Sequence, residues 1–350
     1  MDFVPPFCPS SICSAHEKPG RSWFTRDGYY RPKCRRLPVP RFRCRVCGRG
    51  FSRQTFRHDY GDHKPHTNAA TYLHLVSGVG LRQTARLVGL DVHSVQGKLR
   101  KMARTCRRLH DNLCVELRAT EYLLDEEETY ENASIRTVTM PVVIERETWF
   151  VVATTAGPIR RLAKAGSRRR RWQERDEKKN GRRPDASRAC VRGALEDLRK
   201  RLPEGARIQL HSDLKSSYAT LAKSVFGDAV THLRTPGRAA RTTANPLFPI
   251  NTTLAMTRDN NGRLRRKSWL VSKKAARLVE QMQLFACYRN YVRTRFNRDL
   301  PGETPGRLLG LIERNLQAHE VLAWSQRWGR RSIHPTSVDG SRTHDMVAAA

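Results

Sequence analysis

The sequence predicts a mixed α/β domain preceded by two smaller modules, and three observations lead to this class. Three runs rich in β-forming residues follow one another with short polar breaks over residues 121–156, which is typical of antiparallel strands. Helical and strand-like patterns then alternate over residues 187–233. Residues 71–104 carry apolar positions at helical spacing, whereas the first sixty residues are rich in Cys, Pro, Gly and Arg. This order predicts a sheet of both antiparallel and parallel strands.

The amino-acid composition indicates which class of molecule the protein binds. The 350 residues carry 66 Lys and Arg against 33 Asp and Glu, which gives a formal net charge of +33. Hydrophobic residues make up 38% of the chain, enough to build a core, so wholesale disorder is excluded. A folded chain with this surplus of cations repels itself unless a polyanion neutralises it, which favours double-stranded DNA as the partner. No apolar run is long enough for a membrane span, and we expect a cytoplasmic, nucleoid-associated protein.

The pattern divides the chain into four parts. We expect a small metal-organised module at 1–60, a helical DNA-binding domain with a connector helix at 61–118, and the α/β domain at 119–300. A basic insertion near 158–186 interrupts that domain as an exposed excursion. Residues 301–350 are expected to form one further helix and a loose tail. A separate long helix is predicted over residues 271–295.

Two cysteine pairs near the N-terminus have the spacing of zinc ligands. Four residues separate the first pair and two residues separate the second, with thirty residues between the pairs. Four thiolates suit tetrahedral zinc, which so short a segment needs because its own apolar core is small. His16 or Cys34 could substitute for one ligand. The predicted ligands of a structural zinc ion are Cys8, Cys13, Cys44 and Cys47.

A helix-turn-helix pattern follows the cysteine-rich segment. Leu81, Ala85 and Val88 mark one short helix, Gly89 a turn, and Asp91 the N-cap of a second helix. A plain helical hairpin gives the same apolar pattern, but the surrounding cations favour DNA binding. The side chains predicted to face DNA are Arg82, His93, Ser94, Gln96, Gly97 and Arg100.

Acidic residues stand at two predicted strand positions of this basic chain. Asp125 and Glu127 occur in a run of four acids and would share one face of a strand, so either could act. Asp213 ends a predicted strand just before a helix, where it could instead serve as a helix cap. Carboxylates at neighbouring strand ends can hold the divalent cations used in phosphoryl transfer. The sequence therefore predicts a site for hard divalent cations at this edge of the sheet.

A second group of cations precedes and enters the predicted long helix. Their density favours contacts with DNA phosphates. A separate run, Arg168–Arg171 in the insertion, could also clamp DNA but fits a solvated loop equally well. The phosphate-binding candidates are Arg258, Arg263, Arg265, Arg266, Lys267, Lys273 and Lys274.

Taken in this order, the cysteine pairs, LRQTARLVGL, LDEEETYE, LHSD and RLRRKSWLVSK resemble transposases of the first-described bacterial insertion-sequence type. The sharpest match is the family's pattern of Arg, then Arg-Leu-x-Arg-Lys-Ser/Thr, then Ser-Lys. The residues that carry it are Arg258, Arg263, Leu264, Arg266, Lys267, Ser268, Ser272 and Lys273.

This resemblance implies a ribonuclease-H-like enzyme with an Asp-Asp-Glu triad. Asp125 matches the first acid and Asp213 the second. The third acid is expected seven residues before Arg258, where this sequence has Asn251. Three explanations stay open: Asn251 is a ligand in a variant subgroup, Asp259 takes over after a local shift, or the protein is inactive. An amide oxygen carries no charge and would weaken one metal site.

The functional expectation is a transposase that binds terminal inverted repeats, cleaves DNA and transfers the strand, with zinc in its first module and Mg²⁺ or Mn²⁺ in its active site. It would form a homo-oligomer on the DNA. The alternatives are an inactive, transposase-derived DNA-binding regulator, which Asn251 favours, and another nuclease of the same fold. The repeat sequence, the target preference and the choice between copying and excision lie beyond what the sequence specifies.

Overall fold

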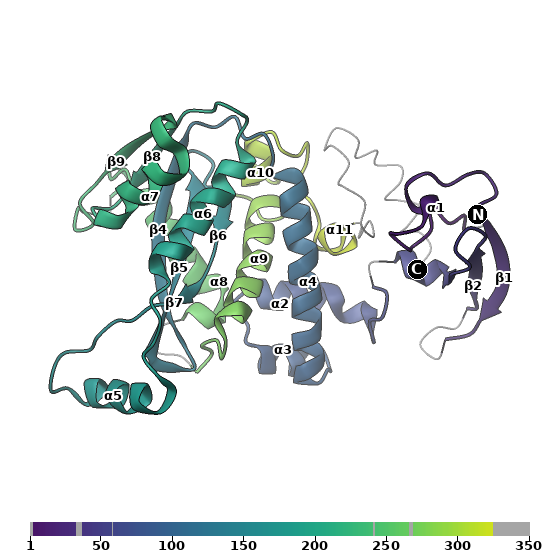
Figure 1. Ribbon diagram of the computed structural model, residues 1–350, viewed down its shortest axis with the longest axis horizontal. Helices are drawn as coiled ribbons and strands as arrows, with labels where there is room; N and C mark the ends of the chain where they lie inside the picture. The colour runs from purple at the N-terminus through teal and green to yellow at the C-terminus, as the bar shows by residue number, and fades with distance from the viewer. Residues whose placement is uncertain (1–2, 33–36, 58, 241, 266–268, 325–350) are drawn as a thin grey trace. The chain divides into compact units, whose positions relative to one another are not determined.

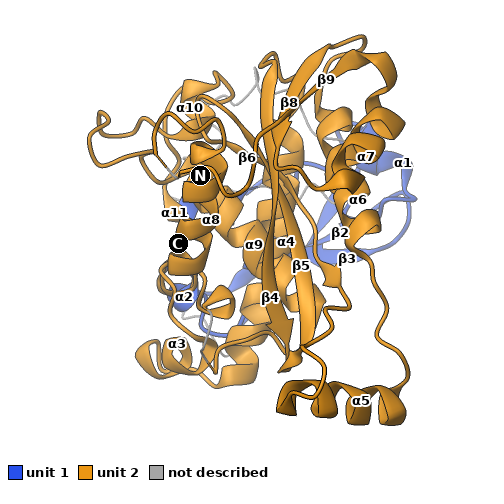
Figure 2. Cartoon of the chain, turned by 90° about the vertical axis from the view of Figure 1, so that its left-hand side faces the viewer, with its two compact units in different colours: residues 1–69, 319–350 blue, residues 70–318 orange. Residues whose placement is uncertain are grey.

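The computed structural model divides the chain into two compact units. One comprises residues 1–69 with 319–350 and the other residues 70–318 (Figure 2). The residues that the structure describes are 3–32, 37–57, 59–240, 242–265 and 269–324.

The first unit is built on a three-stranded antiparallel sheet in the order β1-β2-β3. Phe42 of β2 lies opposite Phe51 of β3, and both rings are buried. Trp23 stacks on Phe51 with 5.5 Å between the ring centroids. The elements are α1 (Ser14–Glu17), β1 (Phe24–Tyr30), β2 (Val39–Cys44), β3 (Gly50–Ser52), η1 (Arg53–Phe56) and η2 (Pro65–Thr67).

The second unit contains a mixed sheet in the order β6-β5-β4-β8-β9, with the two-residue strand β7 paired to β5. The pairs β4–β5 and β5–β6 are antiparallel, whereas β4–β8 and β8–β9 are parallel. The strands are β4 (Glu121–Glu131), β5 (Ala133–Glu145), β6 (Val151–Thr154), β7 (Gly157–Pro158), β8 (Ile208–Ser212) and β9 (Val230–Arg234).

Helices cover both faces of this sheet (Figure 1). Leu123 of β4 and Val142 of β5 pack against Leu254 and Leu278 of α8 and α9 in one apolar cluster, while α6 and α7 lie on the opposite face. The bounds are α2 (Asn68–Val76), α3 (Leu81–Leu87), α4 (Val92–Leu113), α5 (Arg168–Asn180), α6 (Ser187–Arg201), α7 (Ser216–Phe226), η3 (Gly227–Ala229), α8 (Phe248–Asn260), η4 (Gly262–Leu264), α9 (Ala275–Tyr291) and α10 (Pro305–Leu308). The last helix, α11 (Ala318–Ala323), belongs from His319 onward to the first unit.

Several predicted elements differ from the observed ones. The connector expected within 61–118 is the continuation of α4, which is unbroken but ends at residue 113. Helix α8 was not predicted, and the predicted helix 271–295 is confined to residues 275–291. In place of one C-terminal helix, the described residues contain the two short helices α10 and α11; the predicted tail, residues 325–350, lies outside the described residues.

The basic insertion, expected as an exposed excursion, contains a helix that was not predicted. Its charge run forms α5, most of whose residues are exposed. In both Figure 1 and Figure 2, α5 lies beyond the end of the sheet at which β4 turns into β5. Within the described residues, no helix combines the length and the apolar character that a bilayer span requires.

Candidate functional site

Asp125 and Asp213 stand at the carboxyl end of the parallel pairing between β4 and β8. The last paired residues are Leu123 and His211. Asp125 follows Leu123 by two positions on β4, and Asp213 follows His211 by two positions as the first residue beyond the end of β8 at Ser212. Burial raises the pKa of Asp125 to about 6, and the negative charge of Asp213 adds to the rise. The structure therefore brings these two carboxylates together.

Local hydrogen bonds fix the turn that follows β8. The Asp213 carboxylate accepts a hydrogen bond from the backbone N–H of Lys215 at 2.9 Å. This bond makes a tight turn just ahead of α7, so Asp213 helps to shape the start of that helix as well as standing beside Asp125. Gly237, in the segment after β9, also lies against Asp213: a Cβ built on this glycine would be 3.7 Å from the Asp213 Cβ.

A polar network occupies the other face of β4, because neighbouring strand residues point to opposite faces. Glu126 accepts hydrogen bonds from the Lys215 ammonium and, at 3.0 Å, from the Ser187 hydroxyl. Lys215 also donates to the Ser187 Oγ at 2.9 Å. Burial raises the pKa of Tyr218, and the charge of Glu126 raises it further. Sequence reasoning missed these partners, since nothing in the sequence shows which layers meet.

Helix α8 covers the face that carries Asp125. Its Arg258 is ion-paired with Glu127, whose side chain is 1% exposed. This ion pair holds the Glu127 carboxylate against α8. The Phe248 ring contacts Trp149 beyond the end of β5, with centroids 5.9 Å apart. The end of β5 lies beside the start of β4, so the first residue of α8, Phe248, is near the start of β4. Arg258, close to the end of α8, contacts Glu127 further along β4. Helix α8 therefore runs in the same direction as β4.

This direction places Asn251 near the level of Asp125. Asn251 precedes Arg258 by two helical turns on the same side of α8, about 10.5 Å along the axis. Three residues of a strand cover about the same distance. Counting back along β4 by this distance from Glu127, the partner of Arg258, leads to Leu124 and Asp125. Asp259 is exposed and lies about 12 Å along the axis from Asn251. Since α8 is unbroken through both positions, no local shift puts Asp259 in the place of Asn251.

The donors at this point are suited to a hard divalent cation. Two carboxylates and an amide oxygen offer only oxygen ligands, the kind that Mg²⁺ and Mn²⁺ prefer. Throughout the described ranges, a set of three or more converging His, Cys, Asp or Glu ligand atoms occurs only at the cysteines. Among the described residues, no third His, Cys, Asp or Glu therefore converges with Asp125 and Asp213.

The four N-terminal cysteines converge as the sequence predicts. Their Sγ atoms all lie within 4.8 Å of one another. Cys8 and Cys47 are 3.6 Å apart and Cys13 and Cys44 are 3.8 Å apart, measured between sulfur atoms. Zinc with four sulfur ligands at about 2.3 Å in a tetrahedron requires sulfur–sulfur distances of about 3.8 Å. The set therefore fits a zinc ion.

Tight turns present these thiols from both knuckles. The Gly48 N–H donates to the Cys44 carbonyl at 3.0 Å, and Gly48 has φ of 72°, which glycine adopts without strain. In the first knuckle, α1 follows Cys13 directly. His16 is outside the thiol cluster and contacts the Cys8 carbonyl through Nδ1 at 2.6 Å. Cys34 lies outside the described residues.

The helix-turn-helix residues form α3, a turn, and the start of α4. The Asp91 side chain accepts a hydrogen bond from the His93 N–H at 2.7 Å, which confirms the predicted N-cap. Exposed side chains on the two helices are Arg82, His93, Ser94 and Arg100, and Gln96 is half-buried. The exposed face of α4 is therefore available to a groove.

The basic segment after α8 divides into buried and exposed members. Arg263 donates to the Ser272 hydroxyl at 3.2 Å, and burial lowers its pKa. With Arg258 held by Glu127, these two guanidinium groups make structural contacts within the protein. Arg265, Lys273 and Lys274 are exposed; Arg266 and Lys267 lie outside the described residues.

Comparison with known proteins gives two remote structural likenesses. No protein-family model matches the sequence, and no curated protein matches it. The structure of the simian T-cell lymphotropic virus intasome in complex with PP2A regulatory subunit B56 gamma matches at 12% identity, over 68% of this chain and 71% of that chain, with a TM-score of 0.27. The Mos1 strand transfer complex matches at 12% identity, over 64% and 77%, with a TM-score of 0.23. Likenesses this remote assign no activity to this protein.

Proposed function

We propose that this chain is a transposase that cleaves DNA and joins strands with a divalent cation held at Asp125 and Asp213. The observation that supports the proposal is the parallel pairing of β4 with β8, since Asp125 and Asp213 each come two positions after its last paired residues. Three antiparallel strands followed by two parallel ones form the sheet expected of a ribonuclease-H-like enzyme, which supports the same conclusion. Asn251 would contribute the third, neutral ligand.

The residues of this chain would divide the work of catalysis and binding. A divalent cation bound here supplies Lewis-acid polarisation of a scissile phosphate and lowers the pKa of a nucleophilic water. Asp125 and Asp213 hold it, while the Lys215 hydrogen bond keeps Asp213 in place. Arg265 and Lys273 would contact phosphates, the exposed face of α4 would read terminal repeats, and the four cysteines would hold zinc. We further propose that the protein assembles as a homo-oligomer on DNA.

Nicking of supercoiled plasmid DNA tests the catalytic part. The full chain should convert the plasmid to open circles only when Mg²⁺ or Mn²⁺ is present. Asp213→Asn should lower the rate by more than roughly 100-fold, since loss of even a supporting residue around a metal typically costs 10- to 100-fold. Asp228→Asn, the same change at an exposed acid, is the matched control and should leave nicking intact. Equal rates in the two variants would refute the assignment of Asp213.

A non-catalytic DNA-binding protein is the second candidate, and Asn251 favours it. Asn251→Glu discriminates the two. If the site is catalytic, restoring a negative charge should lower the Mg²⁺ concentration needed for half-maximal nicking. Unchanged DNA binding without nicking in both the parent and this variant would support the regulator. Nicking without subsequent joining of a 3′-hydroxyl end would indicate a different nuclease of the same fold.

A further inference from the structure

Helix α5 has an inward face that carries acidic residues and an outward face that carries cations. It begins after Ser167, whose Oγ accepts a hydrogen bond from the Arg170 N–H at 3.1 Å. Gln173 is 7% exposed and marks the inner side. At 100° per residue, Asp176 and Glu177 fall within about 60° of Gln173. Asp176 and Glu177 therefore face the body of the unit.

These inward residues dock α5 onto the end of the sheet. Asp176 receives two hydrogen bonds from Arg136 of β5, at 3.0 and 2.6 Å. Glu177 receives two from Arg160, at 2.7 and 3.0 Å. The Gln173 amide donates to the Arg161 carbonyl at 2.6 Å. Paired bonds of this kind fix orientation as well as position, so α5 is held with a defined outward face.

The outward face carries cations alone. Glu174, the remaining acid of the helix, is ion-paired with Arg170 at 2.8 Å. Across the part of the chain that the structure describes, the outward cations have no carboxylate within ion-pair distance. Like charges three and four residues apart on a helix repel one another, so this arrangement is unfavourable until an anion approaches. The cations, all exposed and within an arc of about 100°, are Arg168, Arg171, Arg175, Lys178 and Lys179.

The length of this row suits a nucleic-acid backbone. Arg168 and Lys178 are ten residues apart, about 15 Å along the helix. This span corresponds to about four base-pair steps of duplex DNA. Trp172 is 45% exposed beside the row, with the Arg168 guanidinium 4.8 Å from its ring centroid. The face thus offers closely spaced cations over the length of several phosphates.

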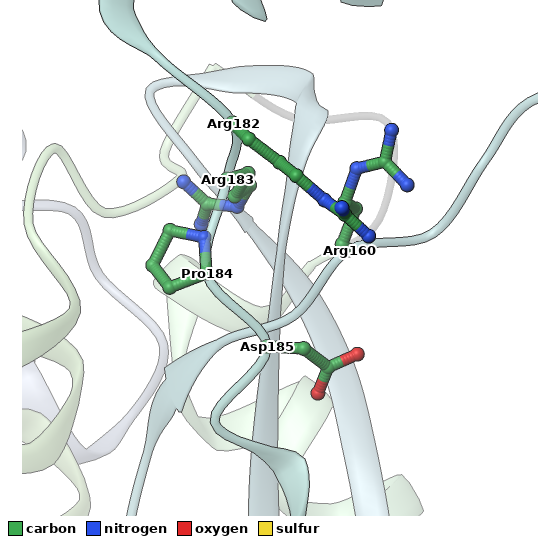
Figure 3. Close-up of a pocket in the computed structure, with 5 residues that line it drawn as sticks. All are labelled: Arg160, Arg182, Arg183, Pro184 and Asp185. Carbon is green, nitrogen blue, oxygen red and sulfur yellow. The ribbon is translucent and has the colours of Figure 1, made fainter.

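A hollow where the chain leaves α5 extends the basic surface. It has a volume of about 420 Å³ and is lined by Arg160, Arg182, Arg183, Pro184 and Asp185. Figure 3 shows the Arg182 side chain reaching toward Arg160, with the Asp185 carboxylate turned the other way. Asp185 accepts a hydrogen bond from the Ser187 N–H at 3.0 Å. The exposed Arg182 therefore continues the row of cations toward α6.

We propose that the outward face of α5 binds the phosphate backbone of duplex DNA beside the segment engaged at Asp125 and Asp213. This inference rests on the proposed function, because that function makes DNA the polyanion. Along β4, Asp125 is six residues from Glu131, which is about 20 Å. Duplex DNA covers this length in about six base pairs. The insertion is thus a second, sequence-independent contact that holds DNA flanking the cleavage site.

Salt-dependent binding of a mixed-sequence duplex tests the inference with the full chain. The test variant is Arg171→Gln, Arg175→Gln and Lys178→Gln together. The matched control, Arg192→Gln, Lys200→Gln and Lys223→Gln, removes the same charge from exposed positions on α6 and α7. In the test variant, the slope of log affinity against log salt should become shallower by ~0.9 for each phosphate that the protein no longer neutralises. The control should retain the parent slope.

Equal slopes in the test variant, the control and the parent would overturn the inference, as would equal decreases in the two variants. Thermal unfolding midpoints within about a degree of the parent would confirm that the charges, and not the fold, were changed. Plasmid nicking in the same preparations separates the two claims. If the parent nicks DNA but the two variants bind alike, the α5 inference fails and the enzyme remains. If only the test variant shows a weaker salt dependence and no protein nicks DNA, the α5 inference holds and the catalytic proposal fails.

Discussion

Asp125 illustrates how one residue can be unstable as an anion and still be well placed for function. Its carboxyl group lies among buried strands with Asp213 beside it, so both burial and the neighbouring charge favour the protonated form. A cation with two positive charges would relieve both effects at once. The raised pKa is therefore a consequence of the same geometry that suits the pair to a metal ion.

This geometry predicts a pH-dependent stabilisation by Mg²⁺. The pKa of Asp125 rises from 3.8 to about 6 on folding. Its contribution to stability is therefore complete below pH 3.8 and is lost as the pH rises through about 6. A cation that binds the ionised pair restores this loss. We expect Mg²⁺ to raise the unfolding midpoint more above pH 6 than below it, measured by calorimetry. The same response to Mg²⁺ and pH in Asp125→Asn would contradict the assignment.

At this scale, sequence reasoning could reach some site residues and not others. Asp125 and Asp213 were predictable because both follow apolar, strand-forming runs. Ser187 and Lys215 were not, because their shared contact with Glu126 depends on how α6 and the start of α7 pack. Arg258 was assigned to phosphate binding because it belongs to a dense group of cations, and its ion pair was not foreseen because Glu127 lies 131 residues away in the chain.

At the scale of elements, helix α8 carries both an ion pair to β4 and the candidate metal ligand Asn251. Arg258 anchors it to β4 through a carboxylate that is 1% exposed, and Asn251 stands two turns earlier on the same side. The anchor therefore sets the height of Asn251 over the sheet. A change at Arg258 should disturb both stability and the candidate metal site.

Removal of this anchor should be strongly destabilising. Arg258→Met leaves the buried Glu127 carboxylate without its cation, which typically costs 3–5 kcal/mol, so we expect about 4 kcal/mol less free energy of unfolding. Urea denaturation measures this value. Arg265→Met, the same change at an exposed position nearby, should cost less than about 0.5 kcal/mol. Combining Arg258→Met with Glu127→Gln should recover part of the loss, and a full additive loss would argue against the pairing.

The extents of the elements could be predicted where the apolar pattern was strong. The helix Ser187–Arg201 buries Val191, Ala194, Leu195 and Leu198 at regular spacing, and it begins where the alternating pattern predicted over residues 187–233 begins. Helix α8 was not predicted, because threonines and asparagines stand among its buried positions and weaken the pattern. In α5 the run of charges hid a helix, since its two faces differ in the sign of charge and not in hydropathy.

At the scale of the whole chain, two units reach stability by different means. The second unit has an extensive apolar cluster between its sheet and α8 and α9. The first has a small core of aromatic rings around four thiols. Burial raises the pKa of the Cys8 and Cys13 thiols, so thiolates there need a cation to neutralise them.

Zinc removal should therefore unfold one unit and spare the other. Structural zinc contributes about 10–16 kcal/mol of apparent binding energy to small modules. After treatment of the full chain with a chelator, hydrogen exchange should show loss of protection in β1, β2 and β3 and unchanged protection in β4 and β5. Cys13→Ser should reproduce this pattern, whereas Cys190→Ser, a half-buried cysteine outside the cluster, should not. Full protection of β1 to β3 after chelation would exclude a structural metal.

The pairing of β4 with β5 determines which face of the sheet each acidic residue of β4 occupies. Asp125 lies opposite Val142, and Glu126 lies opposite Pro141. Adjacent carboxylates therefore emerge on opposite sides, one beneath α8 and the other toward Ser187 and Lys215. A slip by a single position would exchange them and turn Leu123 away from its apolar neighbours. The alignment of this hairpin, and not the number of acids in the run, thus specifies which layer of the protein holds the candidate metal site.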